Sequence, residues 1–124
     1  MKKNAIQTVD ILGTRYLIVV KDYDNEEAFE RRSICGYCDA YTKEIVVCDM
    51  HTYKGWEHEA EKTILQVQKQ TLRHEIVHAF FEESGLSDSS NVFEGAWVKN
   101  EELVDWIANQ GKKIYAAWLE ADAI

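Results

Sequence analysis

The spacing of the apolar residues changes about half-way along the chain, and this change limits the possible folds more than any other feature. In the first half, apolar residues lie in short runs rich in β-branched and aromatic side chains. In the second half they recur every three or four positions, as on one face of an α-helix. A chain whose strands come first and whose helices follow is predicted to be α+β, with the helices packed on one face of a small sheet.

The first half predicts a small antiparallel sheet made of two hairpins. The first hairpin joins a β-rich run that ends at Ile11 to the run Tyr16–Val20, across a turn at Gly13 and Thr14. The second joins 33–38 to 44–48. The charged segment between the two hairpins is expected to be a connection with a short helical turn.

The second half predicts helices. The first begins near Thr71, or as far back as Leu65, and ends before Gly85. After a polar loop, a further helix is predicted from about Asn100 to Gln110, and the helical pattern resumes after Gly111. The apolar stripe of the first helix consists of Leu72, Ile76, Val77, Phe80 and Phe81.

The composition is that of one globular domain, residues 1–124, with 46% apolar residues. A net charge of −8 argues against direct binding to nucleic acid. The longest apolar run, Tyr16–Val20, is far too short to cross a membrane, and no apolar segment follows Lys2 and Lys3 as in a signal peptide. We therefore expect a cytoplasmic protein, and three cysteines in a reducing compartment do not suggest a disulfide framework.

The sequence His74-Glu75-Ile76-Val77-His78 places two histidines four residues apart on a predicted helix. Residues at this separation lie on one face of an α-helix, so both imidazoles can reach a single metal ion. Glu75 follows the first histidine directly and can act as the general base that takes a proton from water. On a helical wheel, His74 and His78 fall at the edge of the apolar stripe. The motif predicts a zinc site with Glu75 as catalytic residue; the alternative is a surface helix with two solvated histidines.

A catalytic zinc ion needs a third protein ligand. The longer motif with a third histidine is absent, so a carboxylate from the next helix is the common solution. On the wheel of that helix, Glu101 lies about 95° from the buried direction and Glu102 about 165° from it. This favours Glu101 as the third ligand. The alternative is that its carboxylate only stabilises the helix, through a favourable interaction with the helix dipole at the N-terminus. The alternatives are Glu102, Asp105 and Glu82.

His74-Glu75-x-x-His78 followed by Asn100-Glu101-x-x-x-Asp105 resembles the gluzincin arrangement of thermolysin-like peptidases. The resemblance implies a zincin-like fold in which His74, His78 and Glu101 hold a single zinc ion. It also implies that Asp105 hydrogen-bonds to His74 as a second-shell residue. The short length, the preceding hairpins and Thr71-Leu72-Arg73-His74-Glu75 are more similar to the small ImmA/IrrE-type metallopeptidase-like proteins of bacteria and phages.

In the resembling folds, the strand before the HExxH helix is an edge strand beside the active-site cleft. Residues 44–48 are the strand in that position here, and their backbone would bind an extended peptide as an additional strand. Peptide hydrolysis also needs an electrophile that stabilises the oxyanion. The sequence does not distinguish between the candidates, which are Tyr37, Tyr41, Tyr53 and His58.

A second group of metal-ligating residues comprises Cys35-x-x-Cys38 and Cys48-x-x-His51. Thiolates and an imidazole at this spacing can close a tetrahedral structural zinc site. A redox-active Cys pair is another interpretation. Buried thiols at strand ends are favoured over both, because free cysteine is among the most buried residue types.

Together these patterns predict a zinc-dependent metallopeptidase that acts on a protein or peptide substrate. One rival is a non-catalytic, zinc-containing binding or regulatory module of a phage or mobile element. Glu75 argues against it, because a purely structural site has no use for a base. A second rival is a protein-interaction module built around the Cys/His group.

Overall fold

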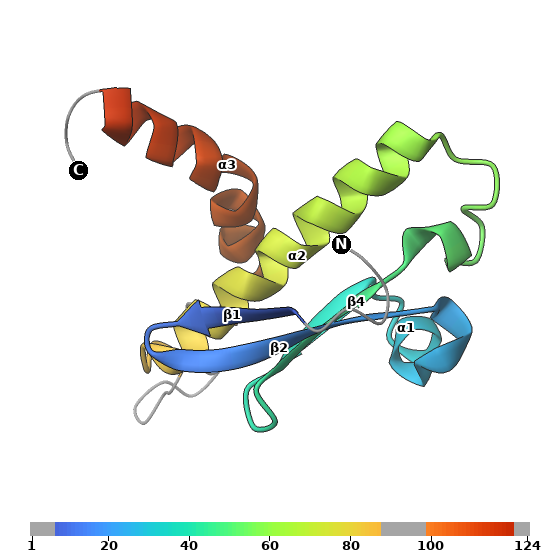
Figure 1. The fold of residues 1–124 in the computed structure, drawn as a ribbon, viewed down its shortest axis with the longest axis horizontal. Coiled ribbons are helices and arrows are strands. Elements are labelled where there is room, and N and C mark those ends of the chain that lie inside the picture. Colours follow the sequence, from blue (N-terminus) through green and yellow to red (C-terminus); the bar gives the residue numbers. More distant parts are fainter. Residues whose placement is uncertain (1–6, 88–98, 121–124) are drawn as a thin grey trace.

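The computed structural model describes residues 7–87 and 99–120, with backbone only for 117–119. These residues form a four-stranded sheet, two long helices and three short helical segments (Figure 1). The elements are β1 (Gln7–Ile11), β2 (Thr14–Lys21), η1 (Tyr23–Asn25), α1 (Glu27–Arg31), β3 (Gly36–Asp39), β4 (Glu44–Cys48), η2 (Met50–Thr52), α2 (Glu61–Glu83) and α3 (Glu101–Glu120). The predicted α+β class is confirmed.

Both predicted hairpins are present, because β1 pairs antiparallel with β2 and β3 pairs antiparallel with β4. The prediction of a wholly antiparallel sheet is wrong, since β2 and β4 run parallel and give the strand order β1-β2-β4-β3. The physical reason lies in β4, whose residues 45–48 are all buried. A strand that is apolar on both faces is stable in the interior of a sheet, where both of its edges are paired.

The expectation that residues 44–48 form an edge strand is therefore also wrong. Within the described part of the chain, the strand with an unpaired edge on this side of the sheet is β3. Its first residue, Gly36, lies against α2: an added Cβ would be 2.9 Å from Thr71 Cγ2 and 2.8 Å from the Val46 carbonyl oxygen. Glycine thus allows β3 to approach α2 one turn before His74.

The two long helices exceed their predicted bounds. Helix α2 begins at Glu61, well before Leu65, and ends as expected before Gly85, which has a φ of +83°. Helix α3 passes through Gly111 without a break. A single glycine in a helix costs only about 1 kcal/mol, so it does not end a helix that packs well on either side. The polar loop predicted after α2 lies largely outside the described residues.

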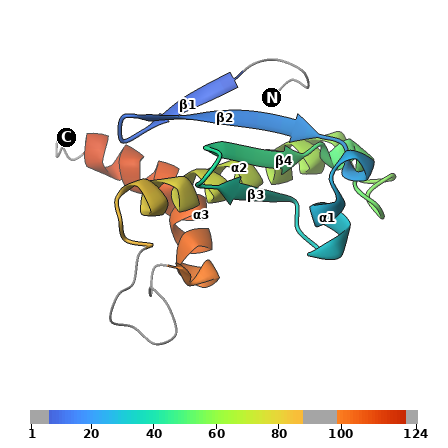
Figure 2. The same ribbon diagram turned by 90° about the horizontal axis from the view of Figure 1, so that it is seen from below.

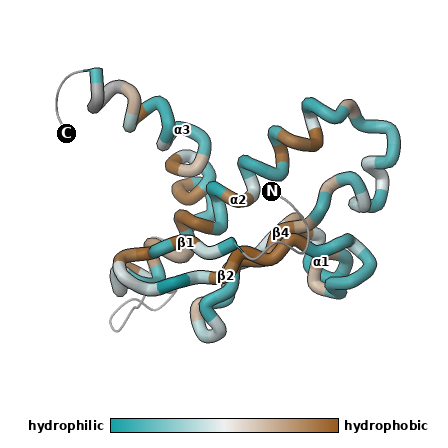
Figure 3. The backbone as a smooth tube through the Cα atoms, in the orientation of Figure 1, coloured by the Kyte–Doolittle hydropathy of each residue, from teal (hydrophilic) through white to brown (hydrophobic). Residues whose placement is uncertain are grey.

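Helix α2 lies across one face of the sheet, and the first part of α3 crosses α2 (Figures 1 and 2). Hydrophobic residues gather along β4 (Figure 3). Ile45 and Val47 pack with Ala79 of α2, while Val46 and Cys48 pack with Phe29 of α1 and with Ile64 near the start of α2. Arg73 of α2 donates from Nε to the Ala108 carbonyl oxygen of α3 at 3.0 Å. These contacts fix the two helices relative to each other.

Glu83, the last residue of α2, connects this helix to the sheet through hydrogen bonds. Its carboxylate accepts hydrogen bonds from the Tyr16 hydroxyl at 2.6 Å, from Lys43 Nζ at 2.7 Å and from the Thr14 hydroxyl at 3.1 Å. The hydrogen bonds from Lys43 and Tyr16 lower the pKa of Glu83. In the part of the chain that the structure describes, no helix has the length and apolar character needed to cross a membrane.

Candidate metal centre

Helices α2 and α3 bring three potential metal ligands together. His74 and His78 lie one turn apart on α2, with their Nε2 atoms 3.1 Å from each other. Glu101 is the first residue of α3. Its Oε2 lies 3.0 Å from His74 Nε2, and its Oε1 lies 3.2 Å from His78 Nε2. One ligand atom from each residue lies within 4.8 Å of the others, and no other such group is found among the described residues.

These separations fit a zinc ion. Two atoms that bind one tetrahedral Zn²⁺ at 2.0–2.1 Å lie about 3.3 Å apart, close to the distances within this group. Two imidazoles and one carboxylate are a ligand set typical of catalytic zinc, and they leave a fourth position open. The side chain of Glu101 remains 66% exposed, so the group faces solvent on one side.

Asp105 orients the first histidine. Its Oδ1 lies 2.5 Å from His74 Nδ1. A carboxylate only accepts hydrogen bonds, so Nδ1 carries the proton and Nε2 directs its lone pair toward His78 and Glu101. Burial lowers the pKa of His78, which keeps this second imidazole neutral and able to bind a metal.

Glu75 follows His74 on α2 and is only 5% exposed to solvent. Its Oε1 is 3.7 Å from His74 Nε2, while its Oε2 is buried and has no hydrogen-bond partner within residues 7–87 and 99–120. Burial raises the pKa of Glu75 to about 7; His74 opposes this rise when it is protonated, and the carboxylate of Glu101 adds to it. A buried carboxylate without full hydrogen bonding costs stability, which is typical of a functional position.

The other carboxylates that the sequence left open lie elsewhere. Glu102 points away from the histidines and lines a separate depression with Leu103 and Trp106. Glu82 lines the cavity in front of the histidines, but its carboxylate is not part of the ligand group. Of the two neighbouring glutamates, Glu101 therefore lies with the histidines and Glu102 does not, as the helical wheel of α3 had predicted.

A cavity of about 500 Å³ opens in front of the group, between α2 and β3. Of the four electrophile candidates, Tyr37 alone lines it. The Tyr37 hydroxyl already donates to Glu26 Oε1 at 2.7 Å. Tyr41 is 99% exposed, and Tyr53 packs against Tyr23 with ring centroids 4.9 Å apart.

Sequence reasoning missed Arg32, which follows α1 and lines the same cavity. A signal was present in the sequence. Arg31 has Glu27 four residues before it and pairs with it at 3.3 Å, whereas Arg32 has Ala28 at that position. Arg32 has no ion-pair or side-chain hydrogen-bond partner among the described residues, and its charge lowers the pKa of Glu75.

The Cys/His group does not form a metal site. Cys35 and Cys48 belong to the core around Phe29, and Cys38 packs against the core on the α2 side. His51 is engaged by Asp49 and Glu61, each 2.7 Å from a ring nitrogen. Burial raises the pKa values of Cys38 and Cys48 to about 12, so both remain thiols at neutral pH.

Comparison with known proteins adds no relative to this description. No protein-family model, curated protein or solved structure matches the chain. The functional interpretation therefore rests on the geometry of the ligand group, Glu75 and the adjoining cavity.

Proposed function

We propose that this protein is a small zinc-dependent metallopeptidase with His74, His78 and Glu101 as metal ligands. The observation that carries the proposal is the convergence of these three groups next to the buried carboxylate of Glu75, whose Oε2 has no hydrogen-bond partner among the described residues. Zn²⁺ bound there supplies Lewis acidity, which polarises a peptide carbonyl and makes water acidic near neutral pH. We infer a zincin-like site, and the support for it is the resemblance of the motifs to the ImmA/IrrE-type proteins together with the closeness of the three ligand groups.

Glu75 acts as the general base and then as the general acid. Its carboxylate takes a proton from the attacking water and returns it to the leaving amine. In the metal-free protein the pKa of Glu75 is about 7, and the positive charge of a bound metal would lower it and favour the ionised form that accepts a proton. Asp105 keeps His74 in the tautomer that binds through Nε2.

The substrate would be an extended segment of a protein or peptide. Strand β3 has an unpaired edge among the described residues, and three of its residues, Gly36, Tyr37 and Cys38, line the cavity in front of the histidines. A peptide that pairs with this edge would pass alongside the ligand group. This assigns to β3 the role that the sequence had suggested for β4.

The proposal is tested with the zinc-loaded protein and a mixture of peptides of varied sequence, with products identified by mass spectrometry. Wild type should cleave a subset of the peptides. Glu75→Gln should retain its zinc and lose cleavage, whereas Glu102→Gln, a substitution at an exposed glutamate that lines a separate depression, should retain both.

Two outcomes would contradict the proposal in different ways. Cleavage by Glu75→Gln at the wild-type rate would show that Glu75 is not the base. Zinc binding by wild type without cleavage of any peptide would favour the rival interpretation, a binding or regulatory module that holds zinc for shape.

A further inference from the structure

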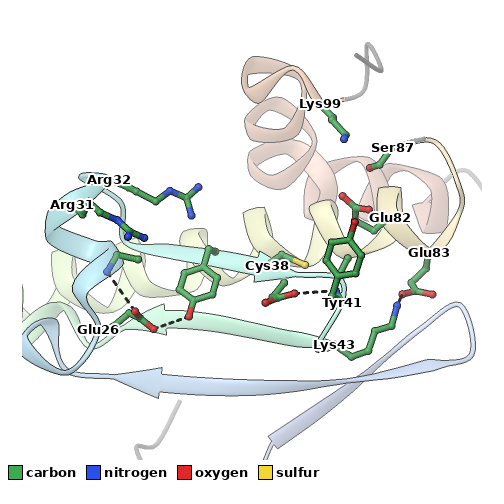
Figure 4. Close-up of a pocket in the computed structure, with 14 residues that line it drawn as sticks. Glu26, Arg31, Arg32, Cys38, Tyr41, Lys43, Glu82, Glu83, Ser87 and Lys99 are labelled. Carbon is green, nitrogen blue, oxygen red and sulfur yellow. Dashed lines mark hydrogen bonds and ion pairs between the residues drawn. The ribbon is translucent and has the colours of Figure 1, made fainter. Parts of the chain in front are cut away.

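A second and larger cavity adjoins the one in front of the histidines. Its volume is about 690 Å³, and it lies over β3 and the turn that follows, between the end of α1 and the end of α2 (Figure 4). The two cavities share Arg32, Tyr37, Cys38 and Glu82 as lining residues. They therefore form one continuous depression, with the metal ligands toward one end and the larger cavity toward the other.

Most charged groups in this larger cavity already have partners. Arg31 pairs with Glu27, and Lys43 pairs with Glu83. Glu26 accepts hydrogen bonds from Tyr37 and Lys21, and Asp39 accepts them from the backbone N–H groups of the following turn.

Arg32 and Lys99 differ from these groups. No described residue forms an ion pair or side-chain hydrogen bond with either of them. Both side chains line the cavity, Arg32 from the end of α1 and Lys99 from just before the start of α3 (Figure 4). This is unexpected in a chain with 22 acidic and 14 basic residues, where carboxylates are abundant.

We propose that this cavity binds a carboxylate of the peptide substrate and that Arg32 is the residue that binds it, with Lys99 as a flanking positive charge. The proposal rests on the proposed peptidase function and specifies its substrate class. The carboxylate is either an acidic side chain close to the cleaved bond or the C-terminal carboxylate of a short peptide.

The chemistry of Arg32 supports this ligand. A guanidinium presents paired N–H groups in one plane, which match the two oxygens of a carboxylate. Arg32 lies at the junction of the two cavities, so a carboxylate bound there belongs to a residue near the one that faces the metal ligands. Glu82 lines the same cavity and has no ion-pair partner among the described residues, so it would repel a doubly charged phosphate more strongly than a singly charged carboxylate.

The test measures binding to zinc-loaded Glu75→Gln protein by fluorescence anisotropy, so that cleavage does not remove the probe. The probes are fluorescein-labelled alanine octapeptides with an amidated C-terminus, in which each position in turn is Glu or Gln. A second pair, all-alanine peptides with a free or an amidated C-terminus, tests the other source of the carboxylate.

Either in the Glu/Gln series or in the pair with free and amidated C-termini, the peptide with the carboxylate should bind roughly ten- to a hundredfold more tightly than its neutral counterpart. This is the effect of a charge-assisted hydrogen-bonded pair. Adding Arg32→Gln should remove this difference without changing zinc content or circular dichroism. The matched control, Arg31→Gln, should preserve it, because Arg31 is already paired with Glu27.

The proposal is overturned if Glu and Gln peptides bind equally at every position and the two C-terminal forms also bind equally. It is also overturned if the preference survives Arg32→Gln. Failure of the peptidase function is a separate result: wild type then cleaves no peptide, whereas failure of this proposal alone leaves cleavage intact and indifferent to the carboxylate.

Discussion

The metal-free protein should become more stable when Glu75 is replaced by Gln. Burial raises the pKa of Glu75 from its ordinary value of 4.5 to about 7. The folded state therefore binds a proton that the unfolded state releases between these two pH values. Stability is present in full below pH 4.5 and declines as the pH rises to about 7. At about 1.4 kcal/mol per pH unit, the ionised carboxylate costs about 3 kcal/mol above pH 7.

Gln has the shape of Glu but cannot ionise, so it removes this cost. We expect the metal-free Glu75→Gln variant to exceed wild type in free energy of unfolding by up to about 3 kcal/mol at pH 8, with little difference at pH 4.5. Urea denaturation in the presence of a chelator measures both values. Glu82→Gln is the control, because an exposed side chain should change stability by less than about 0.5 kcal/mol.

A Glu75→Gln variant that is less stable than wild type at pH 8 would refute this reasoning. It would mean that the carboxylate is held by favourable contacts and is part of the structural framework. A gain in stability would instead identify Glu75 as a residue that is kept at a cost, which is the pattern of a functional group.

Three further predictions concern metal affinity, packing and acid stability. In competition with a chelator, Glu101→Ala should lose the most zinc affinity, Asp105→Asn about ten- to a hundredfold, and Glu102→Ala little; a greater loss for Glu102→Ala would relocate the ligand. Gly36→Ala should destabilise the protein by about 1–3 kcal/mol in urea denaturation, since its Cβ would be 2.8 Å from a carbonyl oxygen; a neutral effect would contradict the close approach of β3. The lowered pKa of Glu83 gives stability that is present above pH 4.5 and is lost as the pH falls through the folded-state pKa. In Glu83→Gln, the free energy of unfolding should therefore depend less on pH in that range. An unchanged pH dependence would exclude this contribution.

Local patterns predicted most of the helices and strands and which side chains share one face of a helix, because both depend on short-range spacing. Positions four apart on a helix define one face whatever the fold, so His74 and His78 could be paired from the sequence alone. The same periodicity distinguished Glu101 from Glu102 on the next helix. Both hairpins were predicted because each joins neighbouring runs through a short turn.

The arrangement of the hairpins could not be read from local patterns. Whether β2 lies beside β3 or β4 depends on how the connection through α1 packs, which is a tertiary matter. The fully apolar β4 contained the relevant signal, since a strand buried on both faces belongs in the interior of a sheet. Arg32 was missed because the cavity that it lines exists only in the folded chain.

The zinc content of the purified protein tests the central claim most directly. Wild type prepared with zinc present and freed of excess metal should contain a stoichiometric amount by elemental analysis. His78→Ala should lose this zinc, and Cys38→Ala should keep it. Zinc that survives His78→Ala but is lost on Cys38→Ala would contradict the assignment of the metal to His74, His78 and Glu101, and so would a wild type that binds none.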